Sequence, residues 1–144
     1  MNTLPLVYVL ATGGTISGKG ASSTSFTEYT AGALLGEELV RSVPEIAQFA
    51  RVRAEQVANV RSSDLMLDDW LRLVRRIERI FADDAEVAGV VITHGTNTIE
   101  ETAYFLNLTV RHDRPVVLTG AQRPATALGA DGPLHLLSAI RVAI

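Results

Sequence analysis

The sequence predicts an α/β protein with three layers, in which an open parallel sheet has helices on both faces. The first observation is a set of four short apolar segments bounded by turn-forming or polar residues, which is typical of buried strands. The second is that segments with helical periodicity separate them, and strands that alternate with helices form parallel sheets. The 144 residues have the length of one domain, which we place at 1–144. The strands are expected at 5–11, 49–59, 87–93 and 115–119.

The segment after the first strand predicts a long mobile loop. Residues 12–28 are rich in glycine, serine and threonine, which offer few groups for packing. A loop of this length in a compact domain commonly acts as a lid or a binding loop. We expect Thr30 to cap the first helix, which turns leucines inward and ends at Pro44.

Three further helices follow in the sequence. Asp68 and Asp69 suit the positive N-terminal end of the second helix. Thr98 opens a Thr-x-x-Glu capping box at the start of the third. Pro133 suits the first turn of the last helix, which we expect at 133–144. The apolar face of the second helix has spacings of three, four and seven and comprises Leu67, Trp70, Leu71, Val74, Ile77 and Phe81.

Composition disfavours several classes of function. The formal net charge is −3 and the arginines are spread along the chain, so we expect no nucleic-acid partner. The chain has no cysteine, and its three histidines lack metal-ligand spacing, so we expect no metal. No apolar stretch approaches the roughly 20 residues that span a bilayer, so no membrane partner is expected. Met1 leads almost directly into the first strand, without a secretory signal, and we expect a cytoplasmic protein.

Two turns of the chain share the pattern Thr-x-Gly-Thr, at 12–15 and 93–96. Each follows a predicted buried strand, and open α/β sheets bind ligands beyond the carboxyl ends of their strands. Two threonines that converge there favour nucleophilic chemistry or anion binding. The first turn also matches most of a P-loop through Gly13, Gly18 and Lys19. Nucleotide binding is disfavoured, because the next residue is glycine where Mg²⁺ binding needs a hydroxyl.

The threonines themselves have two interpretations. A threonine hydroxyl is a poor nucleophile at neutral pH, so Thr15 needs an activating partner, and Tyr29 beyond the loop could swing in to supply one. Thr96 could direct a hydroxyl and a backbone N–H into the same space. The alternative is that Thr15 only caps a turn or helix, and that Thr96 and Asn97 only cap the helix that follows.

A third polar cluster follows the second predicted strand. Ser62, Ser63 and Asp64 could cap a helix or turn, or could hold the charged ends of an amino acid. His94 is expected to pack within its turn, and an Arg123–Asp131 pair is expected to fix the glycine- and proline-rich loop. The pairs expected on the solvated surface are Arg75–Arg76 and Asp113–Arg114.

In their order and spacing, three segments together resemble the bacterial-type L-asparaginase family. They are Ala11-Thr12-Gly13-Gly14-Thr15-Ile16, the segment Ile92–Thr102, and Thr119-Gly120-Ala121-Gln122-Arg123-Pro124 leading to Ala130-Asp131-Gly132-Pro133. The resemblance implies the fold of an asparaginase N-terminal domain. It also implies hydrolysis of asparagine to aspartate and ammonia without a cofactor, sometimes with glutaminase activity.

The resemblance further implies roles for particular residues. Thr15 matches the nucleophilic threonine that forms an acyl-enzyme, and Tyr29 matches the lid tyrosine that helps to activate it. Thr96 matches a second essential threonine, associated with water activation and oxyanion stabilisation. Ser62 and Asp64 match residues that hold the carboxylate and ammonium ends of the substrate.

The same resemblance places Asn97 in the catalytic group and Gly14, Ser63, Gly95 and Ala121 at the substrate. The family normally has aspartate where this chain has Asn97. Losing one charge-assisted hydrogen bond there costs about 1.5–3 kcal/mol. The family usually has glutamine at the position of Ser63, so a substrate contact is expected to be lost.

Two hypotheses follow for function. On the resemblance, a catalytic lysine and a C-terminal domain lie beyond Ile144, and the longer protein forms a homo-oligomer, a dimer or a tetramer. The first hypothesis is a threonine-dependent amidohydrolase that acts on a small amino-acid substrate. The alternative is a non-catalytic or truncated fragment of the same fold that binds amino acids with little or no turnover.

Overall fold

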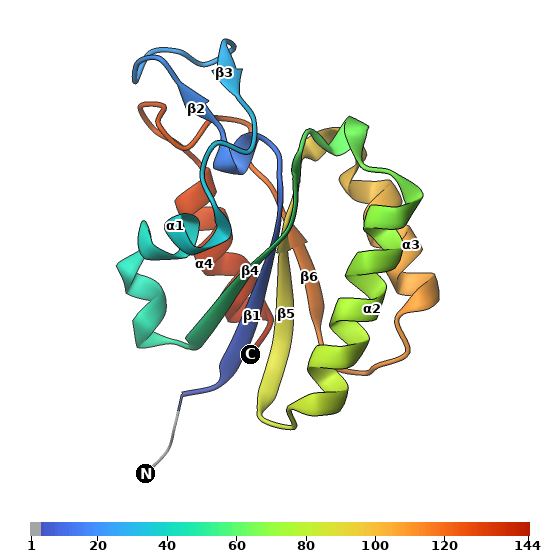
Figure 1. Ribbon diagram of the computed structural model, residues 1–144. Helices are drawn as coiled ribbons and strands as arrows, with labels where there is room; N and C mark the ends of the chain where they lie inside the picture. Colours follow the sequence, from blue (N-terminus) through green and yellow to red (C-terminus); the bar gives the residue numbers. More distant parts are fainter. Residues whose placement is uncertain (1–3) are drawn as a thin grey trace.

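The computed structural model describes residues 4–144 and has the expected α/β architecture (Figure 1). The main sheet has four strands in the order β4-β1-β5-β6, and every neighbouring pair is parallel. The strands are β1 (Leu6–Gly13), β4 (Arg51–Val60), β5 (Val87–Thr93) and β6 (Val116–Thr119). The helices are α1 (Gly36–Arg41), α2 (Leu67–Asp83), α3 (Ile99–Thr109) and α4 (Gly132–Val142). The predicted fold class is confirmed.

Helices cover both faces of the sheet, because the buried strands present apolar side chains to each side in turn. Tyr8 and Leu10 of β1 pack with α2 and α3, whereas Val7 and Val9 pack with α1 and α4. The amphipathic face predicted for α2 is confirmed only in part, because Ile77 and Phe81 are buried as predicted whereas Leu67 is 59% exposed. The face also contains the buried Leu73 and Ile80, which were not predicted. Among residues 4–144, no helix is both long and apolar enough to span a bilayer.

The segment predicted as one mobile loop contains ordered structure. A 3₁₀ turn, η1 (Thr15–Ser17), follows β1, and two short strands then form an antiparallel hairpin. These strands are β2 (Lys19–Gly20) and β3 (Tyr29–Thr30). In Figure 1 the hairpin rises beyond the carboxyl ends of the sheet strands. A lid position is therefore retained, but its base is a paired hairpin.

One predicted helix cap is wrong, and a second is right in position but not in its hydrogen bond. Thr30 lies in β3, and α1 begins six residues later, where the carboxylate of Glu38 accepts a hydrogen bond from the backbone N–H of Leu35 (2.7 Å). Thr98 is the N-cap residue of α3, as predicted, but its side chain makes no capping hydrogen bond, because its hydroxyl donates to the carbonyl of Ser62 (2.9 Å). In both cases a contact between segments replaces the local interaction that the sequence pattern indicates.

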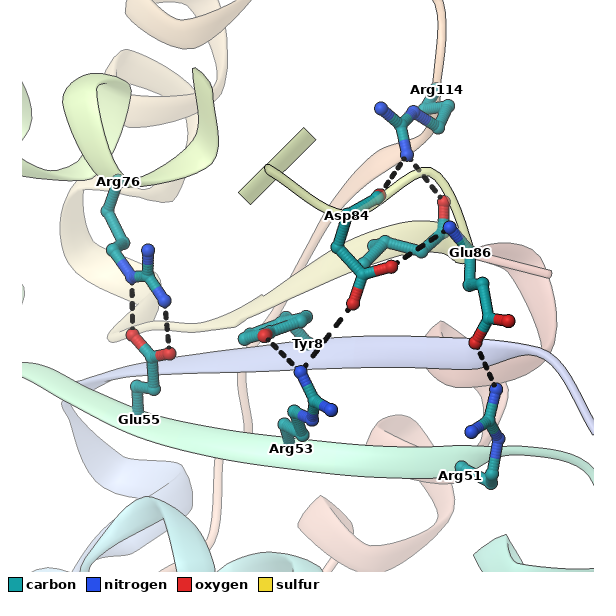
Figure 2. Close-up of polar contacts among 9 residues, drawn as sticks. Tyr8, Arg51, Arg53, Glu55, Arg76, Asp84, Glu86 and Arg114 are labelled. Carbon is teal, nitrogen blue, oxygen red and sulfur yellow. Dashed lines mark hydrogen bonds and ion pairs between the residues drawn. The ribbon is translucent and has the colours of Figure 1, made fainter. Parts of the chain in front are cut away.

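Charged contacts join the edge strand β4 to α2 and to the turn between α2 and β5 (Figure 2). Arg76 of α2 donates two hydrogen bonds to Glu55, which raise the pKa of its guanidinium. Arg114 donates to the backbone carbonyls of Phe81, Asp84 and Val87. The prediction that Arg76 and Arg114 lie on the solvated surface is therefore wrong, whereas the neighbouring Arg75 and Asp113 are exposed.

Candidate active site

The two Thr-x-Gly-Thr turns meet at the carboxyl ends of β1 and β5. These strands are hydrogen-bonded neighbours, and Ala11 pairs with Thr93 at their ends. The hydroxyl of Thr12 donates to the carbonyl of Thr93 (2.9 Å) and ties the two turns together. In the sheet, β1 lies between β4 and β5, so the connections that follow β1 and β4 run to opposite sides of β1. Such a position is a topological switch point, where open α/β sheets bind their ligands.

Gly14 allows the turns to touch backbone to backbone. A Cβ atom at this position would lie 2.5 Å from the Cα and N atoms of Gly95, and its φ of 78° disfavours other residues. The N–H of Gly14 donates to the carbonyl of Val60 (3.0 Å), and its carbonyl accepts from the N–H of Gly32 (3.2 Å). The contribution of Gly14 to the site is therefore the close approach of the two turns.

Thr15 and Tyr29 are paired in the structure. Their hydroxyl oxygens lie 2.6 Å apart, within hydrogen-bond distance. Thr15 is half-buried in the turn after β1, and Tyr29 reaches it from β3 of the hairpin. The structure therefore brings the phenol to the threonine hydroxyl.

The hairpin is held in place by the loop between β6 and α4. The N–H of Gly20 donates to the hydroxyl of Thr126 (2.9 Å), and the N–H of Ala125 donates to the carbonyl of Gly18 (2.9 Å). The N–H of Leu128 donates to the carbonyl of Ser23 (2.8 Å). These three bonds fix the position from which Tyr29 reaches Thr15.

Asp131 joins the end of that loop to its beginning. Its carboxylate accepts hydrogen bonds from the backbone N–H groups of Gln122 (2.8 Å) and Arg123 (3.0 Å). Burial acts to raise the pKa of Asp131, but these bonds outweigh it and hold the pKa below its ordinary value. Arg123 donates to the carbonyl of Gly129 (3.1 Å) instead of pairing with Asp131. The expected Arg–Asp ion pair is replaced by two sets of side-chain-to-backbone bonds.

The third side of the site comes from the turn after β4. Ser62 is 5% exposed, and its carbonyl accepts from Thr98. A Cβ atom on Gly95 would lie 2.7 Å from the Ser62 hydroxyl oxygen, so this glycine also serves close packing. The ends of β4, β1 and β5 thus converge on one space.

That space is a cavity of about 270 Å³, a size suited to a small metabolite. Its lining contains glycine, alanine, hydroxyl-bearing residues, one amide and one guanidinium. The lining residues are Gly14, Thr15, Thr27, Tyr29, Ala31, Arg61, Ser62, Gly95, Thr96 and Asn97. Seven of the ten residues predicted for the site are in this list.

The other three predicted residues lie outside the lining. Ser63 and Asp64 are exposed in the 3₁₀ turn η3 (Ser62–Asp64), and Ala121, in the loop after β6, is only 2% exposed. Thr27, Ala31 and Arg61 line the cavity but were not predicted. Arg61 could have been found, because it is a cation placed directly between the end of β4 and Ser62. Thr27 and Ala31 offer no sequence signal, since only the fold of the hairpin brings them there.

His94 lies beneath the second turn and is fully buried. Its Nδ1 is 2.7 Å from the carbonyl of Gly95, and its Nε2 is 2.9 Å from the hydroxyl of Thr102. Since a carbonyl only accepts, Nδ1 carries the proton and Nε2 accepts from Thr102. Burial lowers the pKa of His94 and favours this neutral form. The structural role predicted for His94 agrees with these contacts.

Within residues 4–144 no group of three histidine, cysteine, aspartate or glutamate side chains is placed to hold a metal ion. The chemistry that the lining offers is that of hydroxyl groups, an amide and a guanidinium. An activated hydroxyl beside hydrogen-bond donors suits nucleophilic attack on a carbonyl carbon.

Comparison with known proteins agrees with this architecture. The family model described as "Asparaginase, N-terminal" matches residues 6–144. An L-asparaginase 2 of Bacillus subtilis is 51% identical over 140 residues, which are 97% of this chain and 37% of the relative. A probable periplasmic L-asparaginase of Haemophilus influenzae is 49% identical over 140 residues, or 97% of this chain and 39% of the relative.

A solved structure gives the same result. The crystal structure of a probable cytoplasmic L-asparaginase from Campylobacter jejuni matches with a TM-score of 0.92 at 47% identity, covering 99% of this chain and 42% of that one. The chain thus spans about two fifths of the length of the proteins it matches. The family model, the relatives and the solved structure match nearly the whole length of the chain, which therefore belongs to the asparaginase family and corresponds to the N-terminal part of its members.

Proposed function

We propose that residues 6–144 act as the N-terminal catalytic domain of an amidohydrolase that converts L-asparagine to L-aspartate and ammonia. The observation that supports this most strongly is the 2.6 Å contact between the hydroxyl oxygens of Thr15 and Tyr29. A neutral threonine hydroxyl needs a hydrogen-bonded partner through which its proton can leave, and the Tyr29 hydroxyl is placed to relay that proton by accepting it and releasing its own. Both residues line the cavity, so a substrate amide can reach them.

The reaction then proceeds in two steps, acylation of Thr15 and hydrolysis of the resulting ester. The Thr15 oxygen attacks the amide carbon, and the Tyr29 hydroxyl takes the Thr15 proton while it gives its own proton toward the amide nitrogen. The C–N bond breaks, ammonia leaves with a proton, and an ester to Thr15 remains. Water then attacks the ester carbon, the bond to Thr15 breaks, and the carboxylic acid and the free threonine hydroxyl are restored.

The remaining lining residues complete this proposal. Thr96 and Asn97 line the cavity after the second strand of the pair, β5, where a hydroxyl and an amide can stabilise negative charge on the carbonyl oxygen. Gly14 and Gly95 keep the two turns close enough to act on one carbonyl group. Ser62 offers a hydroxyl to the carboxylate end of the substrate. Ser63, Asp64 and Ala121 lie outside the lining, and contact of these residues with substrate stays a prediction.

The test is ammonia release from asparagine, measured for the chain itself and for the longest polypeptide that its reading frame encodes. We expect Thr15→Ala to abolish turnover in whichever polypeptide is active, and Thr15→Ser to retain part of it. Thr109→Ala on α3 is the matched control, because it removes a threonine hydroxyl far from the cavity. Equal rates for Thr15→Ala and the unaltered protein would refute the role of Thr15. Aspartate binding without turnover in both polypeptides would favour the amino-acid-binding alternative.

Assembly and location also belong to the proposal. A dimer or tetramer is expected, and light scattering of the longest polypeptide tests it, since a monomer at micromolar concentration would contradict it. A cytoplasmic location stays a prediction. The name of the Campylobacter relative supports it, whereas the name of the Haemophilus relative indicates the periplasm.

A further inference from the structure

The start of α4 holds the chain segment that follows β6. His135 lies near the beginning of this helix, and its Nδ1 is 3.0 Å from the carbonyl oxygen of Gly120. Since a carbonyl only accepts, Nδ1 carries a proton and donates the hydrogen bond. Asp131, the N-cap residue of the same helix, accepts from the backbone N–H groups of Gln122 and Arg123. Two side chains of the helix start therefore tie down the beginning of the loop.

Gly120 in turn lies against the second threonine turn. A Cβ atom on Gly120 would lie 3.0 Å from the Cγ2 methyl of Thr96 and 2.8 Å from the carbonyl oxygen of His94, so its backbone packs closely against both. Thr96 lines the cavity. A threonine side chain has few χ1 rotamers, because its Cβ carries both a methyl group and a hydroxyl. The place of the methyl group therefore determines the direction of the hydroxyl.

The position of Gly120 depends on contacts from outside its own segment. Glycine has no side chain to restrict its backbone, so it has more conformational freedom than other residues. The strand β6 ends at Thr119, whose carbonyl accepts from the N–H of His94 (2.8 Å), and sheet pairing stops there. The next carbonyl is that of Gly120, and the imidazole of His135 holds it.

We propose that His135 is a positioning residue for the amide hydrolysis, and that it keeps the Thr96 hydroxyl in place through Gly120. The proposal rests on the proposed function, in which Thr96 stabilises negative charge on the carbonyl oxygen of the substrate. Loss of the hydrogen bond from His135 frees the peptide group of Gly120, the Thr96 methyl loses a fixed neighbour, and the hydroxyl takes other directions. The charge that Thr96 stabilises develops after the substrate has bound, so the effect falls on kcat more than on KM.

The test is a set of His135 variants of the active polypeptide, measured by ammonia release from asparagine. His135→Ala should lower kcat about tenfold with little change in KM, as expected for the loss of one hydrogen bond that places a reacting group. His135→Asn should restore most of the lost activity, because its amide nitrogen is bonded to Cγ, as Nδ1 is. His135→Gln should not, because its amide nitrogen lies one bond farther out, at the place of Nε2.

The order of these variants separates positioning from helix stability. Helix propensity falls from alanine to glutamine to asparagine, so a purely structural role predicts that His135→Asn is the least active. His112→Ala is the matched control, because it removes an exposed histidine outside the cavity lining and should leave kcat unchanged. An unchanged kcat in His135→Ala, or equal kcat for His135→Asn and His135→Gln, overturns the inference. The amidohydrolase itself still stands in that case, provided that Thr15→Ala is inactive.

A second measurement tests the inference without turnover. NMR of threonine methyl groups observes Thr96 directly, and its signal is identified by its absence in Thr96→Ser. We expect this signal to shift or broaden in His135→Ala and to keep its position in His135→Asn. Such a result supports the positioning of Thr96 by His135 even if no amide is hydrolysed and the proposed function fails. An unchanged Thr96 signal in His135→Ala overturns it.

Discussion

Replacing Gly14 by alanine tests whether contact between the two threonine turns holds the site together. The added Cβ would lie 2.5 Å from the Cα and N of Gly95, and both are backbone atoms that cannot rotate away. The backbone at Gly14 has φ 78° and ψ −173°, a region that costs a residue with a side chain about 1–3 kcal/mol. Overpacking adds about 1–3 kcal/mol. The two contributions sum to a loss of about 2–6 kcal/mol in the free energy of unfolding.

Gly129→Ala is the matched control, because it separates backbone strain from the clash. Gly129 has a similar φ of 70°, but a Cβ there would meet only the movable end of the Arg123 side chain. We expect a loss of about 1–2 kcal/mol for this variant. Urea unfolding of both variants gives the comparison. The reasoning is refuted if Gly14→Ala is no more destabilising than Gly129→Ala.

Three further predictions concern activity, pH and stability. Tyr29→Phe should lower kcat by about a hundredfold or more while KM changes little, because the partner of the Thr15 hydroxyl is lost; steady-state ammonia release measures this. Burial lowers the pKa of His94 in the fold, so that the unfolded chain takes up this proton first as the pH falls below 6.5. The free energy of unfolding should therefore fall as the pH drops below that value, by up to about 1.4 kcal/mol at about pH 5.5, and the fall should vanish in His94→Gln. Arg114→Met should cost about 2 kcal/mol in urea unfolding, since three carbonyls lose their donor, whereas Arg75→Met should cost less than about 0.5 kcal/mol.

The parts of the fold that the sequence predicts well are those set by periodic burial. The strand ending at Thr93 and the apolar face of α2 depend on patterns that many residues share, so single exceptions matter little. The cap assigned to Thr30 is wrong, and Thr98 holds the N-cap position of α3 without the predicted hydrogen bond, because one side chain decides each of these contacts. A partner from a distant segment, as when Ser62 accepts from Thr98, then outweighs the local pattern.

The difference between shared patterns and single contacts also explains which residues of the candidate site the sequence predicts. Thr15 and Thr96 could be placed in advance, because both follow buried strands whose carboxyl ends meet at one edge. The contact of Thr15 with Tyr29 depends on the hairpin and on the loop that contains Thr126, and neither has an apolar period to reveal it. Arg61 was overlooked because an arginine at a strand end is usually solvated, and only the fold shows that this exposed side chain also lines the cavity.

The most direct test of the account is to identify the residue that becomes acylated. The active polypeptide is mixed with substrate, quenched rapidly in acid and digested, and the peptides are analysed by mass spectrometry. The account predicts one acyl group derived from the substrate on the peptide that contains Thr15, and none in Thr15→Ala. An acyl group on another residue, or turnover that continues in Thr15→Ala, would contradict the claim that Thr15 is the nucleophile.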